Sequence, residues 1–273
     1  MPIASILSLW LFLAAPAASP GPTLAREDTL YTAVSEVLIT APRVTLDEIL
    51  DRVARGEARR ESLLTDQTFT ATFRVVRTEK DGKGPVMLEE TVARVYKKRP
   101  HRVRSVILRH WKQKEEEKKS NIEVRFRADM SEDVVNFAFR PEARRDFRYR
   151  ILGRDLLGNH LIYRIAFEPR SPLDPTEPSG MVWVDTNDFV IVRQEVSFSR
   201  SPVPLIIKGI DRMVIERRRV DAHWVLWRIL LRAEAHLSLP MVGRSFDISM
   251  LFDQYAINTG LEDSFFDAGA ERR

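Results

Sequence analysis

Residues 180–198 read GMVWVDTNDFVIVRQEVSF, and this stretch decides the fold. Two runs rich in β-forming residues, 181–184 and 189–198, flank a turn made of residues 185–188. Asp and Asn side chains bond their own backbone and tolerate left-handed geometry, so the stretch predicts a β-hairpin. One parity of the second arm is apolar, at Val190, Val192, Val196 and Phe198. A period of two predicts that one face of the arm is buried and the other is wet.

Similar strand patterns occur on both sides of this hairpin. They cover residues 68–75, 86–96, 102–111, 122–128, 149–152, 161–167, 205–217, 224–239 and 245–255. About ten or eleven strands are more than a flat open sheet usually holds without curling. The sequence therefore predicts a mainly β fold of the α+β type. We expect one strongly curved antiparallel sheet, or an unclosed β-barrel, with a few helices packed on its concave side.

The strongest helix signal is the capping box of residues 45–48, TLDE. The Thr45 hydroxyl can accept from the third helical amide while Glu48 reaches back to the cap. The residues that share one helical face are apolar: Leu46, Ile49, Leu50 and Val53. Gly56 is a plausible C-terminal stop, and residues 57–64 then form a second short helix.

Residues 129–147 do not show the alternation of apolar and polar residues that is typical of a strand. Ser131 is placed to cap a short helix through Phe137, and Phe137, Phe139 and Phe147 lie in an Arg-rich segment. These rings predict a cover over one face of the sheet, and a lid over a groove is the alternative.

The N-terminus predicts export. Residues 1–25 contain no charged side chain, and residues 3–15 are almost wholly apolar. This pattern is typical of a signal peptide, with residues 15–17 or 23–25 as the cleavage site. Spanning a bilayer takes about 20 apolar residues, so an uncleaved anchor is the less favoured reading. We expect a signal peptide at 1–25 and a single half-barrel domain at 26–273, with poorly ordered ends at 26–42 and 258–273, in a periplasmic or secreted protein.

Composition excludes several classes of protein. The chain has 273 residues, of which 44% are hydrophobic, enough for a sizeable core. It has no cysteine, so neither a disulfide framework nor a lipidated export signal is expected. Basic clusters at 97–104, 140–150 and 217–219 predict solvated strand faces or docking to anionic lipid or an acidic partner. Export argues against a nucleic-acid partner.

No catalytic or metal-binding motif stands out. The five histidines form no HxxxH or HExxH pair, and no nucleophile elbow or phosphate-binding loop is present. Asp185 and Asp188 are explained by a turn, and His223 by another. We therefore expect no enzyme, no cofactor and no metal; a hydrolase whose residues converge from distant strands is a weaker alternative.

The second half of the chain resembles a known family. The residues that carry the resemblance are 149–153 (YRILG), Gly158, 163–169, 180–185 (GMVWVD), 193–195 (RQE), Trp224 and Trp227. In this order they are similar to the outer-membrane lipoprotein-sorting superfamily of periplasmic carriers (LolA, LolB and RseB-like proteins). The match covers residues 45–257.

The resemblance implies an unclosed β-barrel whose concave side, with helices as a lid, shelters a lipid, a lipoprotein acyl chain or another hydrophobic ligand. Candidate residues for such a groove are Phe126, Trp183, Phe189, Met213, Trp224 and Trp227. Side chains of this kind more often belong to the ordinary core, and that is the alternative for each of them. The alternative function is an envelope interaction or sensor module of the same fold, which binds a protein partner and transports no lipid.

Overall fold

The computed structural model describes most of the chain beyond the N-terminal region. The described residues are 44–78, 84–113, 133–157, 160–171, 178–198, 207–235 and 245–267. The predicted signal peptide, the predicted strand at 122–128 and most of the Pro-rich segment 169–179 lie outside them. Within these ranges, no helix has both the length and the apolar character that crossing a membrane requires.

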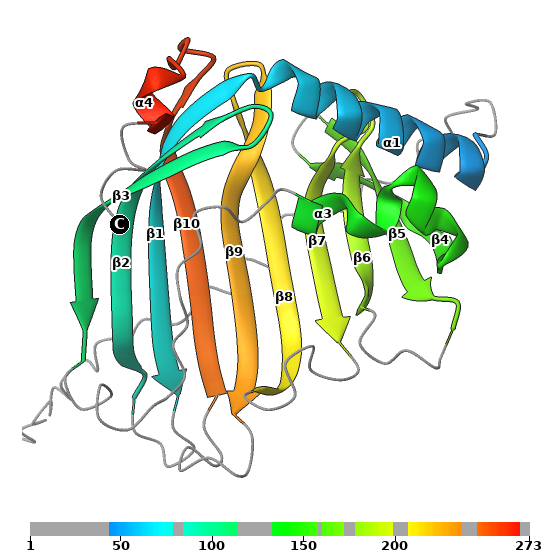
Figure 1. Ribbon diagram of the computed structural model, residues 1–273. Coiled ribbons are helices and arrows are strands. Elements are labelled where there is room, and N and C mark those ends of the chain that lie inside the picture. Colours follow the sequence, from blue (N-terminus) through cyan, green and yellow to red (C-terminus); the bar gives the residue numbers. More distant parts are fainter. Residues whose placement is uncertain are drawn as a thin grey trace, which may run out of the picture.

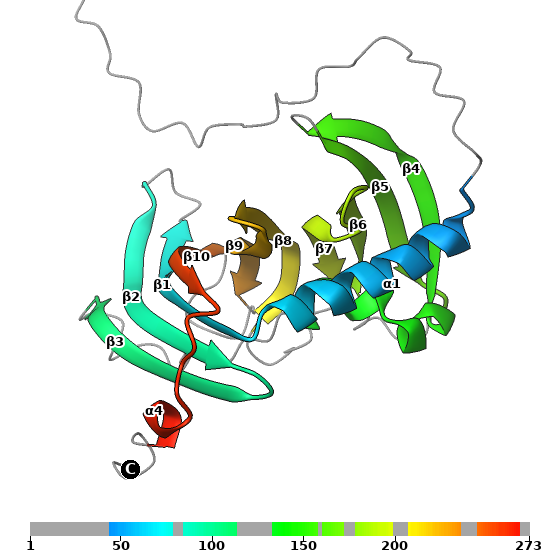
Figure 2. The ribbon, with the colours of Figure 1, turned by 90° about the horizontal axis from the view of Figure 1, so that it is seen from above.

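Ten strands form one antiparallel sheet (Figure 1). The strands are β1 (Asp66–Thr78), β2 (Val86–Lys98), β3 (Arg102–Lys112), β4 (Phe147–Leu157), β5 (His160–Pro169), β6 (Pro178–Asp185), β7 (Ile191–Phe198), β8 (Ile207–Val220), β9 (His223–Ala235) and β10 (Ser245–Ile257). Their order is β3-β2-β1-β10-β9-β8-β7-β6-β5-β4, so β3 and β4 end the described sheet and the barrel does not close. Figure 2 shows the curvature of the sheet. The predicted mainly β, unclosed architecture is confirmed.

The helix α1 (Leu46–Leu63) crosses one end of β4–β8 (Figure 1). The predicted cap is confirmed, since the Glu48 N–H donates to the Thr45 Oγ1 at 3.2 Å. The Glu48 carboxylate does not reach back, and instead binds Arg52 at 2.5 Å. The predicted stop at Gly56 is wrong, because α1 continues through it to Leu63 without a break. Gly56 instead lies where the helix meets the backbone of the β6–β7 turn, so its small size serves packing.

The concave side of the sheet, here called the inner face, holds the main core. Ile49, Leu50 and Val53 of α1 belong to one buried cluster that also includes apolar side chains of nine of the ten strands. A second cover consists of α3 (Asp133–Asn136), η1 (Phe137–Phe139) and η2 (Pro141–Arg145). The predicted role of the rings as a cover of the sheet face is confirmed: Phe139 and Phe147 are buried and lie edge-on to Phe167.

The β6–β7 hairpin has the predicted turn. One carboxylate oxygen of Asp185 accepts the N–H groups of Asn187 and Asp188, both at 2.9 Å. The Asp185 main chain pairs with Val190 and Phe189, and Phe189 has a positive φ of 55°. The turn is therefore fixed by a buried side chain, as its Asx composition predicts.

Replacing Asp185 by alanine is expected to lower the free energy of unfolding by about 2 kcal/mol, because the N–H groups of Asn187 and Asp188 lose a charged acceptor. Asp185→Asn keeps an acceptor oxygen and is expected to lose less than half as much. Urea unfolding of both variants tests this ranking. Equal losses in the two variants would show that the turn depends on the charge and not on the acceptor.

The predicted parity of the second arm is wrong at one position. Val192 packs with Ile162 and Trp183 on the face opposite α1, here called the outer face. Val184 pairs with Ile191 while Trp183 pairs with Arg193, so Val192 is the extra residue of a β-bulge. A bulge shifts the alternation of inward- and outward-facing side chains by one residue, so a strict period of two fails beyond it.

Residues 258–267 are also ordered against the sheet, although their polar composition predicts a poorly ordered end. The Asn258 Oδ1 accepts the Thr65 N–H at 2.9 Å. The buried Asp66 carboxylate accepts the N–H groups of Thr259 and Gly260 at 2.8 and 3.0 Å. These bonds, which composition alone does not disclose, hold the segment that leads to α4 (Ser264–Asp267).

Candidate functional site

The apolar lining of the inner face continues beyond the two covers, toward the end of the strands away from α1. There Phe73, Val75 and Leu88 form a separate buried cluster. Partly exposed apolar side chains pack against this cluster: Val86, Phe246, Ile248 and Met250. On β3, Ile107 pairs with the inward-facing Ala93 and is 63% exposed. We call Ile107 together with the partly exposed four the open apolar surface of the inner face.

Two of the predicted groove residues lie on the inner face. Met213 is partly buried and packs against the main core. Phe189 does the same from the β6–β7 turn, where the Arg52 guanidinium lies 5.2 Å from the centre of its ring. Both residues therefore belong to the covered part of the inner face and not to its open part.

The three predicted tryptophans do not come together with these two residues. Trp183 is buried in the outer-face cluster, where the Arg193 guanidinium lies over its ring. Trp224 packs against the same cluster and donates its indole N–H to Asp188 at 2.9 Å. Trp227 is half-buried under the Arg228 guanidinium, at 4.3 Å. Phe126 lies outside the described residues.

A buried ion cluster ties α1 to the sheet. One oxygen of Glu57 accepts from Arg217 at 2.6 Å and from the Ile191 N–H at 2.8 Å. The other oxygen accepts from Arg60 at 3.2 Å, and Arg217 also donates to the Ile191 carbonyl at 2.9 Å. Burial alone would raise the pKa of Glu57, but the attraction of Arg217 and Arg60 and the two hydrogen bonds hold it below its ordinary value. The cluster thus stays charged in the interior.

The sequence gives one signal for this cluster. Glu57 follows Val53 by four residues, so it lies on the apolar face of α1 and not on its solvent-exposed face. A charge at such a position needs a buried partner. That partner, Arg217, was expected in a solvated basic cluster at 217–219, and the structure corrects this because the Arg217 side chain is fully covered.

Arginines outside the predicted basic clusters form ion pairs on the outer face. On the outer face Arg193 bridges Glu195 and Glu216, each at 2.5 Å, and Arg232 binds Asp247 at 2.7 Å. Ladders of this kind are typical of solvated strand faces and contribute little individually.

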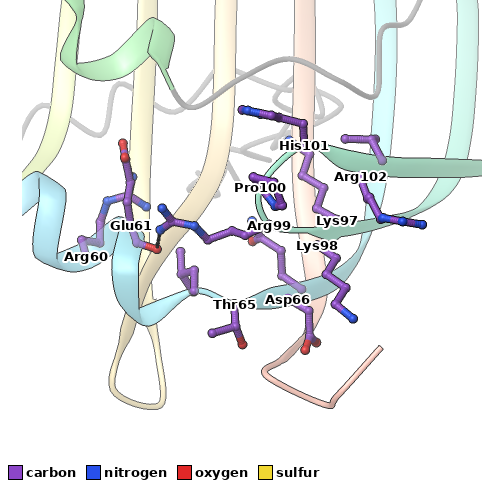
Figure 3. A pocket seen from close by; sticks show the side chains of 13 residues that line it. Arg60, Glu61, Thr65, Asp66, Lys97, Lys98, Arg99, Pro100, His101 and Arg102 are labelled. Atoms are coloured by element: carbon purple, nitrogen blue, oxygen red, sulfur yellow. Dashed lines mark hydrogen bonds and ion pairs between the residues drawn. The ribbon is translucent and has the colours of Figure 1, made fainter. Parts of the chain in front are cut away.

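A basic pocket opens where α1 ends, beside the β2–β3 turn (Figure 3). It is a cavity of about 430 Å³. Its polar lining consists of Arg60, Glu61, Thr65, Asp66, Gln67, Lys97, Lys98, Arg99, His101 and Arg102. Figure 3 shows Arg99 reaching across to Glu61, whose main-chain carbonyl accepts its hydrogen bond. A smaller cavity of about 280 Å³ lies between α1 and the segment 136–142.

The described residues offer little for catalysis. No three His, Asp or Glu side chains among them lie close enough to hold a metal ion. His160 contacts Asp185 at 2.8 Å, but this carboxylate is already the acceptor of the hairpin turn. The arrangement is that of a β-turn whose carboxylate also binds a neighbouring histidine side chain.

No protein-family model and no curated protein matches the sequence. Solved structures of similar fold include a DUF1329 family protein from Desulfovibrio piger, 13% identical, covering 82% of this chain and 98% of that one, with a TM-score of 0.41. An outer membrane lipoprotein-sorting protein domain from Vibrio parahaemolyticus is 11% identical, covering 81% and 98%, with a TM-score of 0.38. A LolA superfamily protein from Nitrosomonas europaea is 11% identical, covering 82% and 97%, with a TM-score of 0.31. The resemblance is one of fold.

Proposed function

We propose that this protein is an exported, non-enzymatic binding protein that shelters a lipid or an acyl chain on its inner face. The observation that supports the proposal best is the open apolar surface, which continues the main core beyond α1 and η1. Its side chains come from β2, β3 and β10, of which β10 lies far from the other two in sequence, and all face the same concavity.

The energetics favour an acyl chain as the ligand. Each methylene removed from water contributes about 0.8 kcal/mol, so a chain laid along several strands gains several kcal/mol before association costs. No reaction is needed for release. Transfer of the ligand to a partner suffices.

Lipid content tests the proposal directly. We expect the full chain, purified from the periplasm without detergent, to contain extractable lipid and to take up a fluorescent fatty acid. Replacing Ile248 and Met250 by glutamine is expected to weaken this uptake at least about tenfold, since both side chains belong to the open apolar surface.

The matched control replaces Leu230 and Leu251 by glutamine. These leucines are 39% and 38% exposed, and they follow the inward-facing Ile229 and Met250, so they point to the outer face. Uptake by the control is expected to stay within about twofold of the unaltered chain. A protein that contains no lipid and binds none, or a control that loses uptake equally, would overturn the proposal.

One observation favours a second function, recognition of a protein partner. The strand β3 ends the described sheet and exposes five apolar side chains, of which the largest are Ile107 at 63%, Leu108 at 61% and Trp111 at 43%. An edge of this kind can accept an added strand. Cross-linking in the envelope that maps a partner to β3, on protein without lipid, would favour this function over the first.

A further inference from the structure

Gln194 of β7 is a wholly buried amide on the inner face of the sheet. Within the described part of the chain, neither its amide oxygen nor its amide nitrogen has a hydrogen-bond partner. It pairs with Val182 of β6 and Ile215 of β8, which belong to the main core, so its side chain points to the inner face. An amide has two donor hydrogens and an acceptor oxygen, and leaving them unpaired in the interior destabilises the fold.

Other polar side chains packed against the main core are satisfied. Tyr149 donates to the main-chain carbonyl of Ala138, and Tyr255 donates to that of Leu226 at 2.7 Å. Stability alone does not explain the glutamine at position 194, because an apolar side chain of similar size would leave no polar atom unpaired there. A partner from outside the chain would explain it.

A buried water does not supply this partner. A water in the interior needs about two to four polar partners. The backbone of β7 is already paired on both sides, with β6 and with β8. The side chains beside the amide, Val182, Ile215 and Val196, are apolar and buried. A water at this position would therefore bond the Gln194 amide alone.

A row of directly paired side chains connects Gln194 to the open apolar surface. The row runs from Gln194 to Ile215 of β8, Ile229 of β9 and Met250 of β10. Met250 belongs to the open apolar surface and packs against both apolar clusters of the inner face. Neighbouring strands are about 4.8 Å apart, so three steps place the amide about 14 Å from Met250 along the sheet. An acyl chain that lies along this row would bring one end to the amide.

The cover on this side of the inner face is the segment of α3 and η1. α3 contacts β7, and its Val135 is part of the main core (Figure 1). Its polar links to α1 are weak, since Asn136 reaches Glu61 only at 3.4 Å and Arg144 of η2 binds the exposed Asp51. The cavity of about 280 Å³ lies between this segment and α1, so the segment has room to shift.

We propose that Gln194 binds the polar group of a neutral lipid whose chain lies along this row, with α3 and η1 displaced to admit it. The proposal deepens the proposed function and rests on it. Because both the oxygen and the nitrogen of the amide are unpaired, the matching group both donates and accepts, as a hydroxyl or an amide does. A charged head group does not fit, because Val182, Ile215 and Val196 offer it no counter-ion.

The test compares three neutral probes by calorimetry on the full chain: 1-dodecanol, N-methyldodecanamide and methyl dodecanoate. The alcohol and the amide both donate and accept a hydrogen bond, whereas the ester has the shape of the amide but only accepts. Gln194→Met keeps the length of the side chain and removes its hydrogen-bonding groups. It is expected to weaken binding of the alcohol, the amide or both at least about fivefold relative to binding of the ester.

Gln67→Met is the matched control. Gln67 is a partly buried glutamine near the start of β1, next to the end of α1, and its replacement is expected to leave all three affinities within about twofold. Urea unfolding without ligand is the second measurement. Gln194→Met is expected to raise the urea midpoint, because it removes a buried amide that bonds nothing in the chain.

The outcomes separate the two proposals. Selective loss of the alcohol or the amide in Gln194→Met supports both, and shows which of the two groups the site takes. Affinities that keep their ratios in Gln194→Met overturn the polar contact and leave the proposed function. Binding of none of the probes by the unaltered chain overturns the proposed function and this contact with it. A lower urea midpoint in Gln194→Met, or an equal selective loss in Gln67→Met, overturns the contact alone.

Discussion

Replacing Gly56 by alanine is expected to lower the free energy of unfolding by more than about 3 kcal/mol, although alanine is the better helix former. A Cβ at this position would lie 2.4 Å from the Phe189 carbonyl oxygen and 2.5 Å from that of Asp188. Both atoms are backbone, so no side chain can turn away, and overpacking of this kind typically costs about 1–3 kcal/mol or more. Propensity alone predicts the opposite sign, a gain of about 1 kcal/mol. Chemical denaturation followed by circular dichroism measures the difference.

Ala58→Gly is the matched control for this prediction. Ala58 is exposed on the same helix, two residues on, so the change reports helix propensity without a contact to the hairpin. It is expected to cost about 1 kcal/mol. If Gly56→Ala were as stable as the unaltered chain or more so, the close approach of α1 to the β6–β7 turn would be wrong.

The local parts of the fold could be predicted because their signals are local. The Thr45 cap bonds an amide three residues away, and the Asp185 turn bonds amides two and three residues away. Strand alternation likewise needs only neighbours in sequence, which is why the mainly β architecture could be predicted. The reason for a glycine at position 56 inside the helix lies in residues 188 and 189, more than 130 positions further on, and the sequence near Gly56 holds no sign of them.

The type of the candidate site could be predicted from the sequence, but the residues that form it could not. An apolar concave surface follows from alternation and curvature, but the bulge at Val192 decides which side chains of the central hairpin reach it. The tryptophans illustrate the limit. Trp183 has the size expected of a ligand contact, yet it packs beneath Arg193 on the outer face. The lining instead uses residues without individual signals, such as Ile248 and Met250.

Replacing Glu57 by glutamine is expected to lower the free energy of unfolding by about 3–5 kcal/mol at pH 7, because it removes the buried carboxylate that binds both Arg217 and Arg60 in the interior. The loss depends on pH. Since the pKa of Glu57 in the folded protein lies below its ordinary value of 4.5, its carboxylate stabilises the fold fully above pH 4.5. This stabilisation is lost as the pH falls through the lower, folded-state pKa.

The measurement is urea unfolding of the unaltered chain and of Glu57→Gln between pH 7 and pH 3. The two stability curves are expected to run parallel above about pH 5 and to converge below pH 4.5, since Glu57 then takes up the proton that glutamine mimics. Glu61→Gln is the control: Glu61 is 40% exposed on the same helix and lies 3.7 Å from Arg60, so its removal is expected to cost less than about 1 kcal/mol. If Glu57→Gln cost no more than Glu61→Gln, the cluster would not hold α1 on the sheet, and α1 would be held by its apolar face alone.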